Sequence, residues 1–172
     1  DNKNITCVKV EQARSYISTE PGVRRANQSN YDCVMQFFDR SSALEACGHK
    51  VDKLEILVLG GTWSHYPVQY QEEFVRDIYF AANIFYLRKE RNRLSLEEEI
   101  SINENSKCRI IGLTLETRPD CINMKEINRF RRYNCTRVQI GVQHIDDNIL
   151  KTIKRGCYKQ DTIKALKLLK KN

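Results

Sequence analysis

The sequence predicts an α/β domain whose strands run in parallel and are joined by helices. Three observations lead to this fold class. A strand pattern followed by a helix pattern occurs at least three times, the length of 172 residues suits one hydrophobic core, and the apolar content of 41% is that of a folded chain. Strands that alternate with helices pair in parallel because each helix returns the chain to the same end of the sheet.

Residues 1–28 are expected to form an irregular, basic segment. No periodicity runs through them, and three arginines surround the turn-forming Glu20-Pro21-Gly22, namely Arg14, Arg24 and Arg25. We therefore expect the folded domain itself to span residues 29–172.

The first units of this domain are a helix, a strand and a second helix. Apolar residues recur at helical spacing over residues 31–47 and stop at Gly48. Residues 54–59 form a short apolar run that is typical of a strand buried on both faces. An apolar stripe at spacings of three and four then predicts an amphipathic helix over residues 70–87.

Two further strand and helix units follow a charged connection. Residues 88–107 are rich in charge and asparagine, and a short helix is expected at 95–99 because Ser95 can cap it. The remaining predicted elements are strands 109–115 and 137–142, helix 123–133, a helix that Asp146 caps and Gly156 ends, and helix 159–171.

Residues suited to ligand binding follow each predicted strand. Gly60-Gly61-Thr62 follow the first, Glu116 follows the second, and Gln143 follows the third, with Arg155 twelve residues farther on. The carboxyl ends of parallel strands meet at one edge, so these residues should converge there. Glycines admit a ligand close to the backbone, Glu116 and Gln143 suit hydroxyls or an ammonium, and either Arg118 or Arg155 suits a carboxylate. Taken singly, each feature also fits a turn, a helix cap or a surface charge.

Four runs of the sequence resemble the radical S-adenosylmethionine (radical SAM) core of the Elongator catalytic subunit family. Three are LEILVLGGTWSHYPVQYQEEFVRDIYFAAN, CRIIGLTLETRPD and TRVQIGVQHIDDNILKTIKRG. The fourth, RSYISTEPGVRRAN, resembles the segment that follows the iron–sulfur cysteines of that family. The resemblance covers roughly residues 7–169. It implies that residues 29–172 form a partial (β/α) barrel of the radical SAM type with parallel strands.

The resemblance also implies the chemistry and the partners. In this family a [4Fe–4S] cluster and S-adenosylmethionine make a 5′-deoxyadenosyl radical. An acetyltransferase domain, which we expect to lie outside this chain, uses acetyl-CoA to start a carboxymethyl-type side chain on the wobble uridine of certain tRNAs. The implied partners are tRNA and other Elongator subunits, in the cytoplasm and also the nucleus.

Site residues follow from the same resemblance. The residues that it assigns to S-adenosylmethionine are Gly60, Gly61, Thr62, Glu116, Gln143 and Arg155. We assign contacts with tRNA to Arg14, Tyr16, Arg24 and Arg25.

The chain departs from the family where the cluster should bind. The family has three cysteines at spacings of four and three, whereas here only Cys7 stands before VKVEQARSY. Cys7 is therefore the candidate metal ligand, and it is equally explained as a single thiol. The seven cysteines are irregularly spaced, which predicts neither a disulfide framework nor a self-contained zinc site.

Two other functions stay compatible with the sequence. One is a tRNA- or partner-binding scaffold that lacks the cluster, and a net charge of +7 permits such a polyanionic partner. The other is a radical SAM enzyme of the porphyrin-dehydrogenase type, against which ETRPD and EPGVRRA argue. No apolar stretch approaches the ~20 residues that span a bilayer, so we expect a soluble, intracellular protein without a membrane partner.

Overall fold

The structure is a computed structural model that describes residues 16–87 and 91–172. Its helices are α1 (Pro21–Gln28), α2 (Cys33–Ala46), α3 (Val68–Ile84), α4 (Leu96–Asn103), α5 (Met124–Arg132), α6 (Asp147–Thr152) and α7 (Lys159–Lys171). Its strands are β1 (Lys53–Val58), β2 (Arg109–Thr117) and β3 (Arg137–Ile140), and two short 3₁₀ turns are η1 (Trp63–His65) and η2 (Pro119–Cys121).

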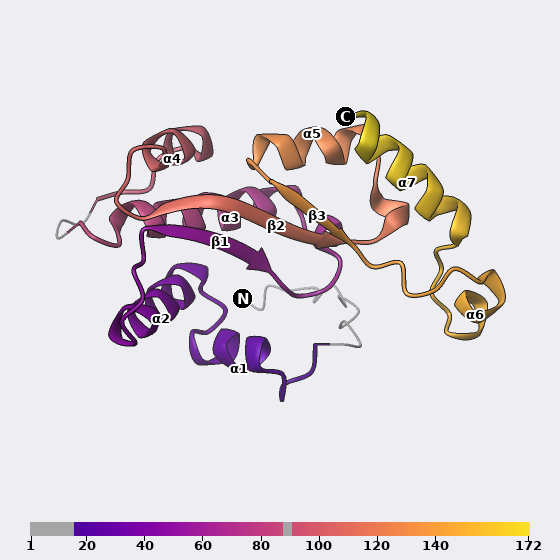
Figure 1. Cartoon of the computed structure of the whole chain (residues 1–172), viewed down its shortest axis with the longest axis horizontal. Coiled ribbons are helices and arrows are strands. Elements are labelled where there is room, and N and C mark those ends of the chain that lie inside the picture. Colours follow the sequence, from indigo (N-terminus) through magenta and orange to yellow (C-terminus); the bar gives the residue numbers. More distant parts are fainter. Residues whose placement is uncertain (1–15, 88–90) are drawn as a thin grey trace, which may run out of the picture.

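The three strands form one parallel sheet in the order β1-β2-β3 (Figure 1). Val58 pairs with Leu115, and Thr117 pairs with Ile140, so all three strands end at the same edge. The predicted fold class, an α/β domain with parallel strands, is confirmed. The sheet is consistent with part of a (β/α) barrel, in which each strand leads into a helix.

The core lies between one face of this sheet and the helices. Figure 1 shows α3, α4 and α5 along one side of the strands, and α2 packs on α3 beside β1. The buried apolar residues of this layer come from every element in it, and include Phe37, Val75, Ile78, Leu96, Leu113, Leu115, Ile127 and Phe130. Alternation along the strands directs every second side chain into this core.

The other face of the sheet is open. On β1 and just after it, Leu57 is 50% exposed and Leu59 is 49% exposed, although both are leucines. On β3, Arg137 and Gln139 are exposed as well. Parallel sheets usually bury both faces. We therefore expect another element or a ligand to cover the exposed leucines of this face. In the expected barrel this face is the inner one.

The structure corrects the expectation for residues 1–28 within the part that it describes. Instead of an irregular segment, residues 21–28 form helix α1. Pro21 stands in its first turn, where the fixed φ of proline suits a helix and its missing N–H costs nothing. Glu20-Pro21-Gly22 is therefore a helix start rather than a turn.

Most element boundaries differ from prediction by one to three residues, and the strand predicted at 137–142 already ends at Ile140. The short helix expected at 95–99 extends to Asn103, and a capping box between Ser95 and Glu98 begins it. Strand β2 continues to Thr117, two residues beyond its predicted end, so Glu116 belongs to the strand rather than to the loop after it. None of the helices in residues 16–87 and 91–172 combines the length and apolar character needed to cross a membrane.

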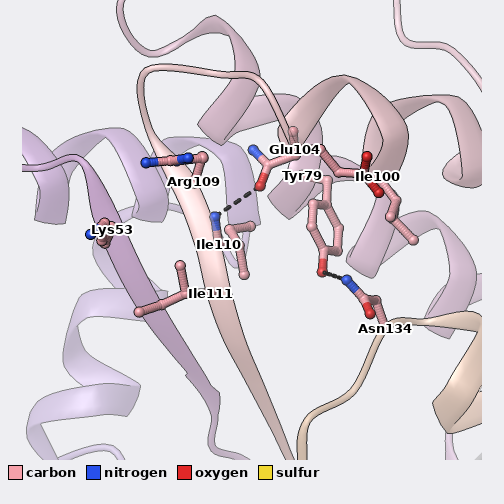
Figure 2. Close-up of a pocket in the computed structure, with 9 residues that line it drawn as sticks. Lys53, Tyr79, Ile100, Glu104, Arg109, Ile110, Ile111 and Asn134 are labelled. Atoms are coloured by element: carbon pink, nitrogen blue, oxygen red, sulfur yellow. Dashed lines mark hydrogen bonds between the residues drawn. The ribbon is translucent and has the colours of Figure 1, made fainter.

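A cavity of about 280 Å³ lies at the edge where the strands begin (Figure 2). Lys53 and Arg109, at the starts of β1 and β2, line it together with Tyr79 of α3. The Tyr79 hydroxyl accepts a hydrogen bond from the Asn134 amide at 3.3 Å, which closes one wall. This cavity is at the opposite end of the strands from the predicted binding residues.

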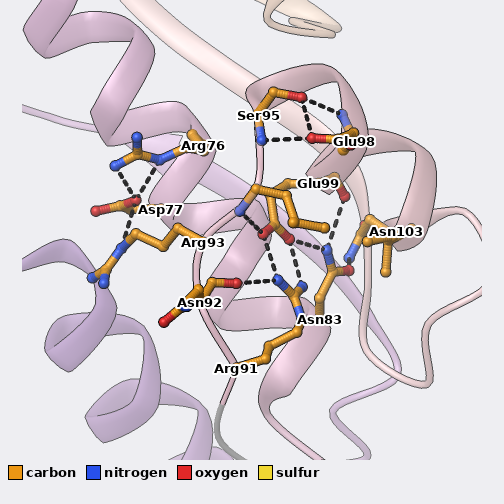
Figure 3. A network of polar contacts seen from close by, with 12 residues as sticks. Arg76, Asp77, Asn83, Arg91, Asn92, Arg93, Ser95, Glu98, Glu99 and Asn103 are labelled. Carbon is orange, nitrogen blue, oxygen red and sulfur yellow. Dashed lines mark hydrogen bonds and ion pairs between the residues drawn. The ribbon is translucent and has the colours of Figure 1, made fainter.

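A buried ion pair holds residues 91–94 against α4 (Figure 3). The Glu99 side chain is fully buried, and both of its oxygens accept from the Arg91 guanidinium at 2.6 Å. The Leu94 N–H donates to it at 3.0 Å and the Asn83 amide at 2.8 Å. Burial by itself would raise the pKa of Glu99, but these donors outweigh it and hold the pKa below its ordinary value.

We expect Glu99→Ala to lower the free energy of unfolding by about 3–5 kcal/mol, because it leaves the Arg91 charge and the Asn83 amide without their partner. Urea denaturation followed by circular dichroism measures this change. The exposed Glu104 at the end of the same helix is the control, and Glu104→Ala should change the free energy of unfolding by no more than about 0.5 kcal/mol.

Glu99→Ala also tests whether the ionised form of Glu99 stabilises the fold. A carboxylate whose pKa is lowered by folding stabilises the protein above its ordinary pKa of 4.5, and this contribution is lost as the pH falls through the lowered value. Part of the acid-induced loss of stability should therefore be absent from Glu99→Ala. Equal acid sensitivity in the two proteins would contradict this assignment.

Candidate functional site

The candidate site is the edge at which the three strands end. The chain leaves β1 through Gly60 and Gly61, whose φ values of 151° and 97° lie in the region that favours glycine. Glu116 is the last residue but one of β2, and Gln143 follows β3. Parallel pairing alone brings these three positions to one rim, as the sequence predicts.

Tyr16 contacts the end of strand β2. Its hydroxyl donates a hydrogen bond to Oε2 of Glu116 at 2.6 Å, across 100 residues of sequence. Burial, followed by the hydrogen bond to Glu116, raises the pKa of Tyr16 to about 12. The hydroxyl therefore joins the segment before α1 to Glu116 at the rim.

Arg155 and Gln143 meet at the end of β3. The Arg155 guanidinium donates to the Gly141 carbonyl at 2.6 Å. A Cβ atom on Gly141 would lie 3.1 Å from Nη2 of Arg155 and 3.3 Å from Nε2 of Gln143, so a larger residue would push the ends of both side chains aside. Gln143 itself has a φ of 68°, a strained conformation that often marks a functional position.

The contacts at the end of β2 and those at the end of β3 belong to the same rim. The Gly141 N–H donates to the Thr117 carbonyl at 3.0 Å, directly after Glu116. Glu116 pairs with Gln139, so both side chains point to the open face of the sheet, and Gly141 follows at the next position of that face. Five of the predicted cofactor residues thus surround the open face where the strands end. The sixth, Thr62, begins η1 and is half-buried.

Two polar contacts at this edge were missed by sequence reasoning. The Ser64 and Thr117 hydroxyls lie 2.7 Å apart and join η1 to β2. The buried Gln71 amide donates to the Tyr66 carbonyl at 2.8 Å and so holds the loop from the helix side. The first pair is distant in sequence and the second depends on which face of α3 is buried, so no local motif indicates either contact.

Cys121 lies near His65 at the same edge, at 3.5 Å from Sγ to Nε2. Burial is the main reason that the pKa of this thiol is raised, so the neutral thiol predominates near pH 7. The pair is therefore a weak candidate for nucleophilic catalysis.

The predicted RNA-binding residues fall into three situations. Arg24 and Arg25 are exposed on α1, where they are free to meet phosphates. Tyr16 is engaged with Glu116 instead of exposed for stacking on a base. Arg14, like the candidate metal ligand Cys7, lies outside the described residues. Across the described ranges, no three His, Cys, Asp or Glu side chains are arranged to hold a metal ion.

Comparison with known sequences identifies relatives of this chain. The sequence profile of the radical SAM superfamily matches residues 43–172. The chain is 42% identical over 157 residues to the tRNA uridine(34) acetyltransferase of Methanocaldococcus infernus, a match that covers 91% of the chain and 28% of that protein. It is 34% identical over 143 residues to Elongator complex protein 3 of Drosophila melanogaster, with coverages of 83% and 25%.

A solved structure agrees with these relatives. The Elp3 protein of Methanocaldococcus infernus, with residues 1–46 deleted, superposes with a TM-score of 0.75 at 41% identity. The match covers 86% of this chain and 32% of that one. The chain therefore spans 25–28% of the length of the two relatives named above.

We expect Gly141→Ala to destabilise the protein by about 1 kcal/mol, because the new Cβ would force the ends of the Arg155 and Gln143 side chains to shift. Gly22 is the matched control, since a Cβ there meets nothing within 4 Å. Gly22→Ala should leave stability unchanged or raise it by up to about 1 kcal/mol. Thermal unfolding of the two variants measures the difference, and equal melting temperatures would contradict the close approach at Gly141.

Proposed function

This chain belongs to the radical SAM superfamily, and within it to the family of the Elongator catalytic subunit; from this premise we propose that it is the S-adenosylmethionine-binding part of an enzyme that modifies the wobble uridine of tRNA. The names of the relatives support the reaction class. The assignment of the cofactor is supported by the rim, which is formed by Gly60, Glu116, Gln143 and Arg155. This rim is the observation on which the proposal depends.

The chemistry of the rim fits S-adenosylmethionine. Its amino acid portion carries an ammonium, which the Glu116 carboxylate and the Gly60 backbone suit, and a carboxylate, which Arg155 suits. Nε of Arg155 is buried and lacks a hydrogen-bond partner among the described residues, which leaves the guanidinium with donor capacity that a ligand would use. Gln143, which is exposed, is suited to the ribose hydroxyls.

The iron–sulfur cluster is the part of the proposal that rests on the family alone. Three thiolates must hold such a cluster and leave one iron for the cofactor. Cys7 is the candidate ligand in this chain. When cluster and cofactor are bound, they supply the radical chemistry, and the residues of the rim bind, orient and shield the cofactor.

The remaining parts of the proposed function concern the whole enzyme. Acetyl-CoA and an acetyltransferase domain belong to the full family protein, with tRNA as substrate and other Elongator subunits as partners. We place this activity in the cytoplasm, with the nucleus as a second compartment. Arg24 and Arg25 are the described residues that we assign to the tRNA phosphates.

We expect Glu116→Gln to weaken the binding of S-adenosylmethionine about tenfold, because the variant replaces a charged acceptor of the ammonium by a neutral one. Equilibrium dialysis of the 172-residue chain measures the affinity. Glu55→Gln is the control, since Glu55 is exposed on β1 away from the rim. If the wild-type chain binds no S-adenosylmethionine, the proposed cofactor site is wrong.

A second function, a tRNA-binding scaffold without a cofactor, is favoured by the basic charge of +7 and the exposed arginines of α1. It predicts tRNA binding without binding of S-adenosylmethionine. The dialysis experiment therefore separates the two functions.

For both functions, the Arg24→Ala, Arg25→Ala double variant should bind tRNA more weakly, and its slope of log affinity against log salt should fall by up to about 2. The measurement is a salt titration by filter binding or fluorescence anisotropy. The matched double variant Lys170→Ala, Lys171→Ala removes the same charge from the last turn of α7. A slope that changes equally in both variants would mean that α1 has no specific role in binding tRNA.

A further inference from the structure

Tyr16 occupies a different place from the one that its resemblance-based role in RNA binding suggests. Its ring is half-buried, and its hydroxyl is committed to Glu116 at 2.6 Å. A tyrosine that stacks on RNA bases presents an exposed ring face. The exposed tyrosine of this region is instead Tyr31, at 60% exposure.

The contact uses only one oxygen of the Glu116 carboxylate. Tyr16 donates to Oε2, and Oε1 has no hydrogen-bond partner among the described residues. A carboxylate fixed through one oxygen presents the other in a set direction. The open face of the sheet lies on that side, because Glu116 pairs with Gln139 and both side chains point away from the core.

The Tyr16 hydroxyl stays protonated beside Glu116. Burial and the hydrogen bond to Glu116 raise the pKa of Tyr16 to about 12, so its hydroxyl keeps its proton at neutral pH and acts as a donor to Glu116. Tyr16 therefore fixes the carboxylate that suits the ammonium of an amino acid.

We propose that Tyr16 is a positioning residue of the cofactor site, which orients the Glu116 carboxylate toward the ammonium group of the ligand. This inference rests on the proposed function, because it takes S-adenosylmethionine as the ligand. It adds a residue from the segment before α1 to a rim otherwise built from strand ends.

The test compares two ligands that differ in the group concerned. S-adenosylmethionine carries the ammonium, whereas 5′-methylthioadenosine retains the adenosine and lacks the whole amino acid portion. We expect Tyr16→Phe to weaken S-adenosylmethionine binding about tenfold and to leave 5′-methylthioadenosine binding unchanged, because only the hydroxyl is removed. Equilibrium dialysis of the chain measures both affinities, and Tyr31→Phe should change neither.

A double-mutant cycle then shows whether Tyr16 acts through Glu116. The variant that combines Tyr16→Phe with Glu116→Gln should bind S-adenosylmethionine no more weakly than Glu116→Gln alone. Additive losses, or an equal loss of both ligands in Tyr16→Phe, would overturn the positioning role. Unchanged affinity in Tyr16→Phe would overturn it as well.

Two further outcomes distinguish a positioning role for Tyr16 from a wrong cofactor and from a role in RNA binding. If the wild-type chain binds 5′-methylthioadenosine but not S-adenosylmethionine, the proposed cofactor is wrong and the inference falls with it. If Tyr16→Phe keeps its affinity for S-adenosylmethionine but loses affinity for tRNA, Tyr16 belongs to the RNA surface. Tyr16→Phe retains the aromatic ring, so we expect its tRNA affinity to equal that of the wild type.

Discussion

The parallel pairing of β2 with both of its neighbours is the constraint on which the rest of the structure depends. It carries the three strand ends to one rim, although almost half of the chain separates Gly60 from Gln143. The helices then have to lie on the face that the strands leave apolar, and the other face stays free for a ligand. Without this pairing, no local motif in the chain would form a site.

Most of the elements could be predicted from the sequence because their signals are local. The helix over residues 159–171 is found within those bounds, since an apolar stripe and a preceding Gly156 define it. The capping role of Ser95 was predictable for the same reason. The convergence of Glu116 and Gln143 was also predictable, because parallel strands impose it whatever the details of packing.

The rest could not be predicted because it depends on contacts between distant residues or on burial. To predict the ion pair between Arg91 and Glu99, one must know that Glu99 faces inward. The sequence shows only a charged stretch. Helix α1 was not predicted because its residues are basic and because its start at Pro21 has the sequence of a turn. The partner of Tyr16 was not predictable either, because a tyrosine near arginines suggests RNA until its contact with Glu116 is known.

The separation of 100 residues between Tyr16 and Glu116 also bears on how the protein folds. Closing so long a loop lowers the conformational entropy of the chain, and contacts that have already formed must offset this loss. Long-range contacts of this kind therefore form late. We expect the sheet and its helices to assemble first and the segment before α1 to dock last. The rim would then acquire its final geometry only at the end of folding, and a nascent chain would expose Glu116 without its tyrosine partner until that step.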